Sequence, residues 1–195
     1  MAELNKEILI YINSFLQSPF WFKFSYIFSD GPIFFLPIFL VGAWIFWTYK
    51  IKNNDKKKVL LFIFYTTLFA VLSNLIFQRF FHFERPEGFC PIDGRLIIDH
   101  IPDASFPSDH AAVSFAFLFA LFLAGYRKTA LVFAPFVIFM NLSRIMACVH
   151  WPFDILAGAL VGIIWAFIVF KLLKQTKIFD KLNNFILKIS SFIKL

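Results

Sequence analysis

The sequence predicts an all-α integral membrane protein: a helical bundle with about five transmembrane spans and an amphipathic interfacial helix at each end. Three observations indicate this class. Hydrophobic residues make up 60% of the 195 residues, whereas roughly half is usual for soluble domains. Long apolar runs recur along the chain, and basic residues gather in alternate connections between them. This composition excludes a soluble domain of ordinary type.

The five predicted spans are apolar runs that carry few or no charges. Each is close to the roughly 20 residues that a helix needs to cross about 30 Å of hydrocarbon. Proline and glycine occur inside several runs, which membrane helices tolerate because packed neighbours satisfy the freed backbone groups. The predicted spans are residues 32–49, 58–78, 111–125, 129–143 and 153–170.

The net charge of +7 would suit a nucleic-acid-binding protein, but the placement of the basic residues does not. They lie between the first and second spans, between the third and fourth, and after the fifth. The positive-inside rule assigns these connections to the cytoplasm and the segments 79–110 and 144–154 to the outside. We therefore expect a multi-pass membrane protein with no nucleic-acid partner.

Residues 1–17 and 178–194 each carry an apolar stripe at helical spacing. The first is predicted to lie on the outer membrane surface and the second, which is rich in lysine, on the cytoplasmic surface. Packing against the bundle, as in a soluble protein, is the alternative. No cleavable signal peptide is evident, because Glu3 and Glu7 stand where a basic region is expected.

The two cysteines, Cys90 and Cys148, both fall on the predicted outer side and lack zinc-ligand spacing. Two interpretations stay open: an outer disulfide that ties the loop to the end of the fourth span, or two unrelated buried thiols. No repeat or long linker divides the chain, so residues 1–195 are expected to form one domain.

Polar and charged residues accumulate at the outer ends of the predicted spans. In a chain this apolar, each such charge is costly unless it has a partner or a function. Taken singly, the arginines could be interfacial anchors and a helix-terminal aspartate could be a dipole partner. Their convergence on one side indicates an active site. The residues are Arg79, Arg85, Ser108, Asp109, His110, Arg144, His150 and Asp154.

His150 is the candidate nucleophile. Asp154 follows it by four residues across Pro152, which begins a helix, so the carboxylate can reach the imidazole and fix its tautomer. Arg144, six residues before His150, offers a planar guanidinium group to phosphate oxygens.

The start of the third span supplies a second group of candidates. Ser108 and the following backbone N–H groups lie at a predicted helix N-terminus, where anions bind. His110 stands beside that position as a second proton-transfer group. Arg85 completes the site from the end of the second span.

Over residues 78–162 the sequence resembles the type 2 phosphatidic acid phosphatases, which share three motifs with vanadium haloperoxidases and bacterial acid phosphatases. Residues 107–110 match the second motif and residues 143–154 match the third completely. The first motif departs from the pattern. Its lysine, seven residues before the Arg-Pro pair, is Gln78 in this chain, and Arg79 is the nearest cation.

The resemblance implies a lipid phosphatase that uses no metal and no cofactor. His150 would attack phosphorus to give a phosphohistidine, Asp154 would hold its ring, and His110 would protonate the leaving oxygen and later activate water. The expected phosphate-binding residues are Arg85, Arg144, Ser108, Arg79 and Asp109.

The expected partner is a membrane lipid phosphate. The short length and the run 101–110 look most similar to bacterial undecaprenyl diphosphate phosphatases, with lipid A 1-phosphatases second and phosphatidylglycerophosphate phosphatases third. The resemblance implies a bacterial plasma membrane, and the placement of the basic residues predicts that the active site faces outward. A protein that only binds or moves lipid phosphates would need the arginines but not the histidines with Asp154. A haloperoxidase would be soluble.

Overall fold

The computed structural model describes residues 2–51, 53–94, 96, 104–175 and 177–192. Regular structure in these ranges is helical throughout, which confirms the predicted all-α class. Two short helical turns, η1 (Phe15–Gln17) and η2 (Trp47–Ile51), extend the first and third helices. The helices are α1 (Ala2–Ser14), α2 (Pro19–Phe28), α3 (Gly31–Phe46), α4 (Asn54–Phe80), α5 (Asp109–Leu123), α6 (Arg127–Met146), α7 (Pro152–Gln175) and α8 (Lys177–Phe192).

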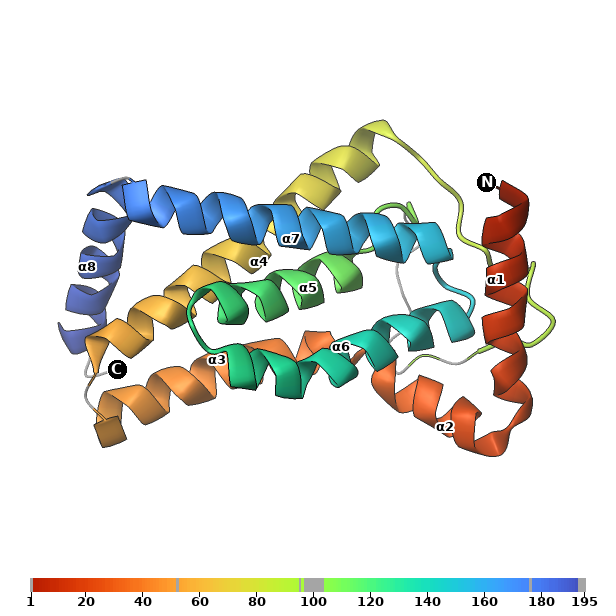
Figure 1. Ribbon diagram of the computed structural model, residues 1–195, viewed down its shortest axis with the longest axis horizontal. Coiled ribbons are helices and arrows are strands. Elements are labelled where there is room, and N and C mark those ends of the chain that lie inside the picture. The colour runs from red at the N-terminus through yellow and green to blue at the C-terminus, as the bar shows by residue number, and fades with distance from the viewer. Residues whose placement is uncertain (1, 52, 95, 97–103, 176, 193–195) are drawn as a thin grey trace.

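Helices α3 to α7 run along the long axis of the molecule and form the predicted bundle (Figure 1). α5 occupies its centre, where it packs against α3, α4, α6 and α7, and its largest interface is with α7. α1 and α8 cross opposite ends of the bundle (Figure 1).

Among the described residues, three helical segments are long and apolar enough to cross a membrane: Asn54–Phe80, Arg127–Met146 and Pro152–Leu173. The shorter apolar helices Phe34–Lys50 and Asp109–Leu123 occupy the other two predicted spans. α5 has 15 residues, which is ~22 Å at the helical rise of about 1.5 Å per residue. It begins after the N-cap Ser108 and ends before Gly125, whose φ is 91°. Its length is therefore set by local signals at both ends, and it is short of the bilayer thickness.

Two glycines of α7 bring its backbone against α5. A Cβ on Gly158 would lie 2.3 Å from the carbonyl oxygen of Ser108, and a Cβ on Gly162 would lie 2.3 Å from that of Ala112. No side chain fits at these distances, so glycine is required for this close approach, as at many helix contacts in membranes. The glycine contact fixes the start of α5, where Ser108 lies, against α7.

α1 packs on the bundle partly through a polar residue. The Asn13 side chain is fully buried and donates to the carbonyl oxygens of Ile92 and Met146 at 2.9 and 2.8 Å. Leu4 and Tyr11 are exposed instead. Leu9 is buried as well, and Glu3 and Glu7 are exposed, so α1 presents a mixed polar and apolar face to the bundle. The buried amide supplies donors to carbonyl groups at the end of α6 and in the loop.

α8 is attached to the opposite end in the same manner. The Tyr65 hydroxyl donates to Oδ1 of Asn183 at 3.0 Å, and Nζ of Lys57 donates to Oγ of Ser190 at 3.3 Å. Phe185 of α8 is exposed. Both terminal helices therefore pack on the bundle through polar side chains such as Asn13 and Asn183 as well as apolar ones such as Leu9.

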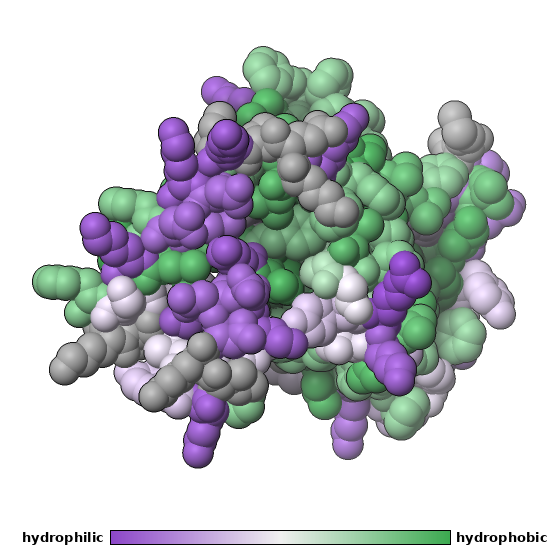
Figure 2. All heavy atoms as spheres, turned by 60° about the vertical axis from the view of Figure 1, so that its left-hand side comes forward, coloured by the Kyte–Doolittle hydropathy of each residue, from purple (hydrophilic) through white to green (hydrophobic). Residues whose placement is uncertain are grey.

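The outer faces of the long helices are hydrophobic. Leu75 of α4, Leu131 of α6 and Leu160 of α7 are all more than half exposed, while polar residues such as Asn141 are buried. Figure 2 looks toward the α8 end and shows hydrophilic side chains gathered beside broad hydrophobic areas. Large exposed apolar surfaces mark contact with a partner or membrane, in agreement with the candidate spans.

Candidate active site

The predicted site residues other than Arg79 lie together at the end of the bundle that α1 covers. His110 lies in the first turn of α5, Arg144 in the last turn of α6, and Asp154 in the first turn of α7. His150 lies between α6 and α7, and Arg85 lies in the segment between α4 and α5. Because successive helices run in opposite directions, these ends come together although the residues are up to 69 positions apart.

The His150 ring is buried and held in one orientation. Its side chain is 4% exposed, and Nδ1 lies 3.0 Å from the carbonyl oxygen of Ser105. A carbonyl oxygen can only accept, so Nδ1 carries the hydrogen and Nε2 keeps its lone pair. Nε2 lies 3.5 Å from Nη1 of Arg85. The nitrogen that can act as a nucleophile therefore faces a guanidinium group.

Asp154 lies near the His150 ring but makes its hydrogen bonds elsewhere. Oδ2 is 3.6 Å from Nδ1 of His150, which is beyond hydrogen-bond distance. The same oxygen accepts from Oγ of Ser105 at 2.5 Å and from the backbone N–H of Trp151 at 2.8 Å. Ser105 is thus the direct partner of the ring and was missed by sequence reasoning, because a serine in an irregular segment carries no distinguishing pattern.

Arg85 is fixed against the α6–α7 turn. Its Nη1 donates to the carbonyl oxygen of Val149 at 2.7 Å, and the neighbouring Glu84 carbonyl oxygen accepts from Nε1 of Trp151 at 3.1 Å. These bonds hold the arginine-bearing segment beside His150, although the two residues are 65 positions apart.

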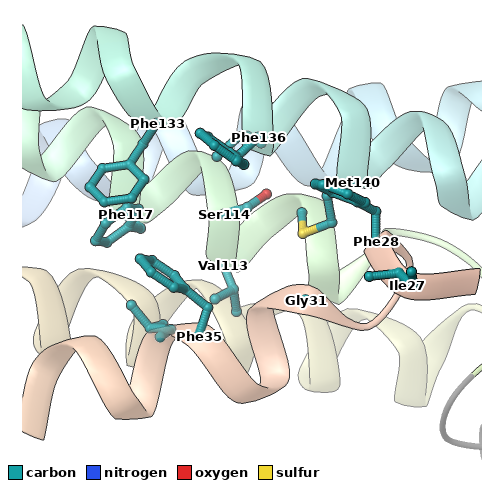
Figure 3. A pocket seen from close by; sticks show the side chains of 12 residues that line it. Ile27, Phe28, Gly31, Phe35, Val113, Ser114, Phe117, Phe133, Phe136 and Met140 are labelled. Atoms are coloured by element: carbon teal, nitrogen blue, oxygen red, sulfur yellow. The ribbon is translucent and has the colours of Figure 1, made fainter. Parts of the chain in front are cut away.

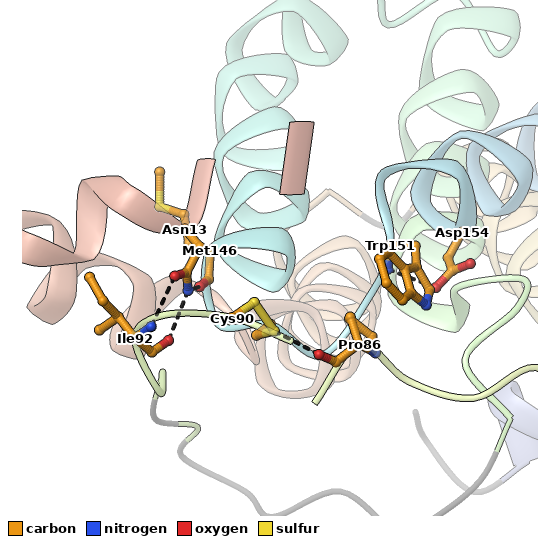
Figure 4. Close-up of a disulfide and its surroundings, with 8 residues drawn as sticks. Asn13, Pro86, Cys90, Ile92, Met146, Trp151 and Asp154 are labelled. Atoms are coloured by element: carbon orange, nitrogen blue, oxygen red, sulfur yellow. Dashed lines mark hydrogen bonds between the residues drawn. A yellow bond between two sulfur atoms is a disulfide. The ribbon is translucent and has the colours of Figure 1, made fainter. Parts of the chain in front are cut away.

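A disulfide joins Cys90 to Cys148, with the Cα atoms 6.1 Å apart, which decides between the two interpretations left open by the sequence. Figure 4 shows the bridge beside Pro86, and Sγ of Cys148 lies 3.1 Å from the Pro86 carbonyl oxygen. Cys148 is two residues before His150, and Pro86 directly follows Arg85. The bridge therefore ties the two functional segments together.

Arg144 is paired with a carboxylate that the sequence did not single out. Its Nη1 donates to Oδ1 of Asp30 at 2.9 Å, and both side chains are 2% exposed. The same Oδ1 lies 3.9 Å from Nε2 of His110. Asp30 sits between α2 and α3, in a stretch to which the sequence assigned no function. The sequence did not indicate the pairing, because Asp30 is 114 residues from Arg144.

His110 belongs to the same cluster as His150. Arg144, His150 and Arg85 all act electrostatically on its ring. Within the described part of the chain, Nε2 of His110 is buried and has no hydrogen-bond partner. A buried polar atom without a protein partner is expected to meet water or a ligand, so this nitrogen is available for proton transfer.

Ser108 and Asp109 form the start of α5. The Ser108 hydroxyl oxygen accepts from the Ala111 N–H at 3.5 Å as the helix N-cap. Oδ1 of Asp109 accepts from the side-chain amide of Asn74 at 2.9 Å and lies 3.4 Å from that of Gln78. These contacts fix α5 against α4. Their expected contacts with phosphate stay predictions from the motif.

The structure brings Gln78, and not Arg79, to the inner side of α4. Gln78 is buried and its side-chain amide donates to the Pro107 carbonyl oxygen at 2.9 Å, whereas Arg79 is exposed. One position along a helix turns a side chain by about 100°, so the two residues cannot face the same neighbour. The expected phosphate contact of Arg79 is not supported by this placement.

Comparisons with known proteins agree on one family. A profile described as "PAP2 superfamily" matches residues 58–178. The bacitracin transport permease protein BcrC of Bacillus licheniformis is 31% identical over 74% of this chain and 68% of its own length. The undecaprenyl-diphosphatase BcrC of Bacillus subtilis is 28% identical over 69% of this chain and 65% of its own.

A solved structure and a more distant relative extend the comparison. The crystal structure of Aquifex aeolicus LpxE superposes with a TM-score of 0.64 at 26% identity, covering 86% of this chain and 95% of that one. A lipid A 1-phosphatase of Rhizobium johnstonii is 28% identical over 52% of this chain and 42% of its own length.

Proposed function

Because the chain belongs to the PAP2 superfamily and is a lipid phosphate phosphohydrolase, we propose that it removes the terminal phosphate of undecaprenyl diphosphate through a phosphohistidine. The proposed catalytic residues are His150, His110 and Asp154. The observation that carries the proposal is the orientation of His150: Nδ1 is engaged by the Ser105 carbonyl oxygen, and Nε2 faces Arg85.

In the first step, Nε2 of His150 attacks the terminal phosphorus and the bond from phosphorus to the bridging oxygen breaks. His110 donates a proton to that departing oxygen. The second ring nitrogen of His150, Nδ1, keeps its hydrogen bond to the Ser105 carbonyl oxygen while the imidazole ring becomes positively charged. The Asp154 carboxylate lies 3.6 Å from Nδ1. A nearby carboxylate stabilises the imidazolium, as in other histidine-based sites.

Two guanidinium groups and the start of α5 would hold the transferring phosphate. Arg85 and Arg144 provide rigid donors, and the N-terminus of α5 at Ser108 supplies a positive dipole end. Most of the acceleration in phosphoryl transfer comes from positioning and charge neutralisation of this kind. Arg144 and His150 are buried, which strengthens charge neutralisation because electrostatic interactions are screened less in a protein interior than in water.

In the second step, a water molecule attacks phosphorus and the bond to Nε2 of His150 breaks. His110, left neutral by the first step, accepts a proton from that water and returns to its starting state. Phosphate leaves, and neither step uses a metal ion.

The similarity to undecaprenyl-diphosphatases favours undecaprenyl diphosphate as the substrate. Undecaprenyl-diphosphatases of Bacillus subtilis and, as a putative enzyme, of Escherichia coli are 28% and 27% identical to this chain. Lipid A is the second candidate, supported by the Rhizobium johnstonii lipid A 1-phosphatase and by the likeness to the Aquifex aeolicus LpxE structure. Phosphatidylglycerophosphate is third and rests on the sequence resemblance alone.

We further propose five spans, α3 with η2 and α4 to α7, in a bacterial plasma membrane with the active site outside. The basic connections support this orientation, since the α3–α4, α5–α6 and α7–α8 connections lie toward the α8 end (Figure 1). The candidate active site lies toward the opposite end.

The test is phosphate release by the purified protein in the presence of a chelator. The substrate panel is undecaprenyl diphosphate, lipid A, phosphatidylglycerophosphate and phosphatidic acid. We expect the fastest release from undecaprenyl diphosphate and none from His150→Ala. Activity that survives in His150→Ala would contradict the nucleophile, and loss of wild-type activity with chelator would contradict the metal-independent mechanism.

A further inference from the structure

An apolar cavity of about 350 Å³ lies between α2, α3, α5 and α6 (Figure 3), at the lower end of the roughly 300–1,000 Å³ range of ligand pockets. Among the described lining residues, Ser114 carries the one polar side chain. Its hydroxyl already donates to the Ala111 carbonyl oxygen at 3.2 Å and accepts from Nδ2 of Asn141 at 3.1 Å. The described lining residues therefore favour an apolar ligand over a polar one.

The lining of the cavity begins close to the candidate active site on two helices. Val113 lines it three residues after His110 on α5, and Met140 lines it four residues before Arg144 on α6. Residues at these spacings share a helix face. The apolar lining therefore starts one helical turn, about 5.4 Å, from the two polar residues.

The turn between α2 and α3 connects the same two regions. Asp30 reaches Arg144 and His110, and the next residue, Gly31, lines the cavity. A ligand that placed a phosphate at Arg144 would thus have its adjoining atoms at the mouth of the cavity.

The far end of the cavity is closed by aromatic rings, and one side opens outward. The ring centroid of Phe133 lies 5.2 Å from that of Phe35 and 5.4 Å from that of Phe117. Phe136 and Ile27, which also line the cavity, are 54% and 60% exposed. A chain that enters the cavity can therefore leave sideways between these residues, into the hydrocarbon that surrounds the helices.

We propose that this cavity binds the hydrocarbon segment nearest the phosphate of the lipid substrate, an assignment that rests on the proposed phosphatase function. Moving a chain from bilayer hydrocarbon into an apolar cavity gains little from the hydrophobic effect, because both surroundings are apolar. The contribution of the cavity is positional: it aligns the phosphorus with His150 and selects lipids by the shape of their first few carbon atoms.

Gly31 allows the cavity to be filled without moving the helices. A Cβ at Gly31 meets no atom within 4 Å and Gly31 lines the cavity, so the side chain introduced in Gly31→Leu is expected to occupy part of the cavity. Gly42 is the matched control, because it lies on the same helix, also has open space at its Cβ, and does not line the cavity.

The measurement is the ratio of kcat/KM for geranylgeranyl diphosphate to kcat/KM for isopentenyl diphosphate, which have the same headgroup and different chain lengths. Wild-type protein is expected to prefer the long chain. In Gly31→Leu the ratio should fall about tenfold, the size of a lost apolar pocket contact, and in Gly42→Leu it should stay at the wild-type value. An unchanged ratio in Gly31→Leu would overturn the assignment.

Photolabelling tests the cavity without turnover. His150→Ala protein is irradiated with a farnesyl diphosphate analogue that carries a diazirine on the isoprene unit nearest the diphosphate. Adducts on the peptides that contain Phe35, Val113 or Met140 would support the assignment, and adducts confined to the outer faces of α4 and α7 would overturn it. If wild-type protein hydrolyses neither diphosphate, the proposed function fails, and the adduct map still decides the cavity.

Discussion

Asp30 and Arg144 form a buried ion pair that joins the turn before α3 to the last turn of α6. Oδ1 of Asp30 accepts from Nη1 of Arg144 at 2.9 Å, and each side chain is 2% exposed. Burying two charges is costly unless geometry and further hydrogen bonds compensate. Since the same carboxylate lies 3.9 Å from His110, we assign it a positioning role for both Arg144 and His110, the proposed phosphate-binding and proton-donating residues.

Asp30→Asn is therefore expected to lower kcat about 100-fold, the cost of misplacing reacting groups by roughly 1 Å. The amide keeps the shape of the side chain but leaves the buried guanidinium without a counter-charge. Steady-state kinetics on the best lipid substrate is the measurement, with exposed Asp93→Asn as the control. If Asp30→Asn keeps the kcat of Asp93→Asn while both remain folded, Asp30 has no positioning role.

The disulfide should contribute to both stability and activity. It closes a loop with a sequence separation of 58 residues, and Cys90→Ser is expected to lose about 2–4 kcal/mol of unfolding free energy. Activity should fall as well, because the bridge holds Pro86 against Cys148. Pro86 directly follows Arg85, and Cys148 is two residues before His150. Thermal unfolding and phosphate release test this. Reductant serves as a control: it should lower wild-type activity and have no effect on Cys90→Ser.

Gly158→Ala is expected to destabilise the protein by about 1–3 kcal/mol, as overpacking in a close-packed core does. The new methyl group would lie 2.3 Å from the Ser108 carbonyl oxygen, so α5 must move away from α7 and His110 with it. Gly42→Ala, whose methyl group meets no atom within 4 Å, is the matched control. Equal melting temperatures for the two variants would contradict the close approach of the helices.

The parts of the site that lie close together in the sequence were predictable. Asp154 is four residues from His150, and the helix start at Ser108 directly precedes His110, so local spacing was enough to associate each pair. The helical class and three long spans were predictable for a similar reason, since span length and apolar composition are local properties.

Residues that reach the site from distant segments were not predictable. Asp30 and Ser105 are 114 and 45 residues from their partners Arg144 and His150, and neither carries a pattern of its own. The sequence also did not predict which of Gln78 and Arg79 faces the site. Both faces of α4 are apolar, so the hydrophobic pattern does not show which face meets α5. The disulfide was undecided for the same reason: its pairing depends on how the helices are arranged.

The proposed orientation predicts opposite labelling at the two ends of the bundle. In intact cells, an impermeant thiol reagent should label Asp93→Cys, which lies between α4 and α5, and should not label Lys128→Cys, at the start of α6. Both positions are exposed, and the native cysteines are paired. Labelling of Lys128→Cys alone would reverse the topology.

A rapid-quench experiment tests whether His150 becomes phosphorylated during turnover. Protein is mixed with undecaprenyl diphosphate labelled with ³²P at the terminal phosphate, quenched at alkaline pH and digested for mass spectrometry. We expect an acid-labile phosphate on His150 in wild-type protein and in the exposed-histidine control His82→Ala, and none in His150→Ala. Phosphate bound covalently to another residue, or turnover by His150→Ala, would contradict it.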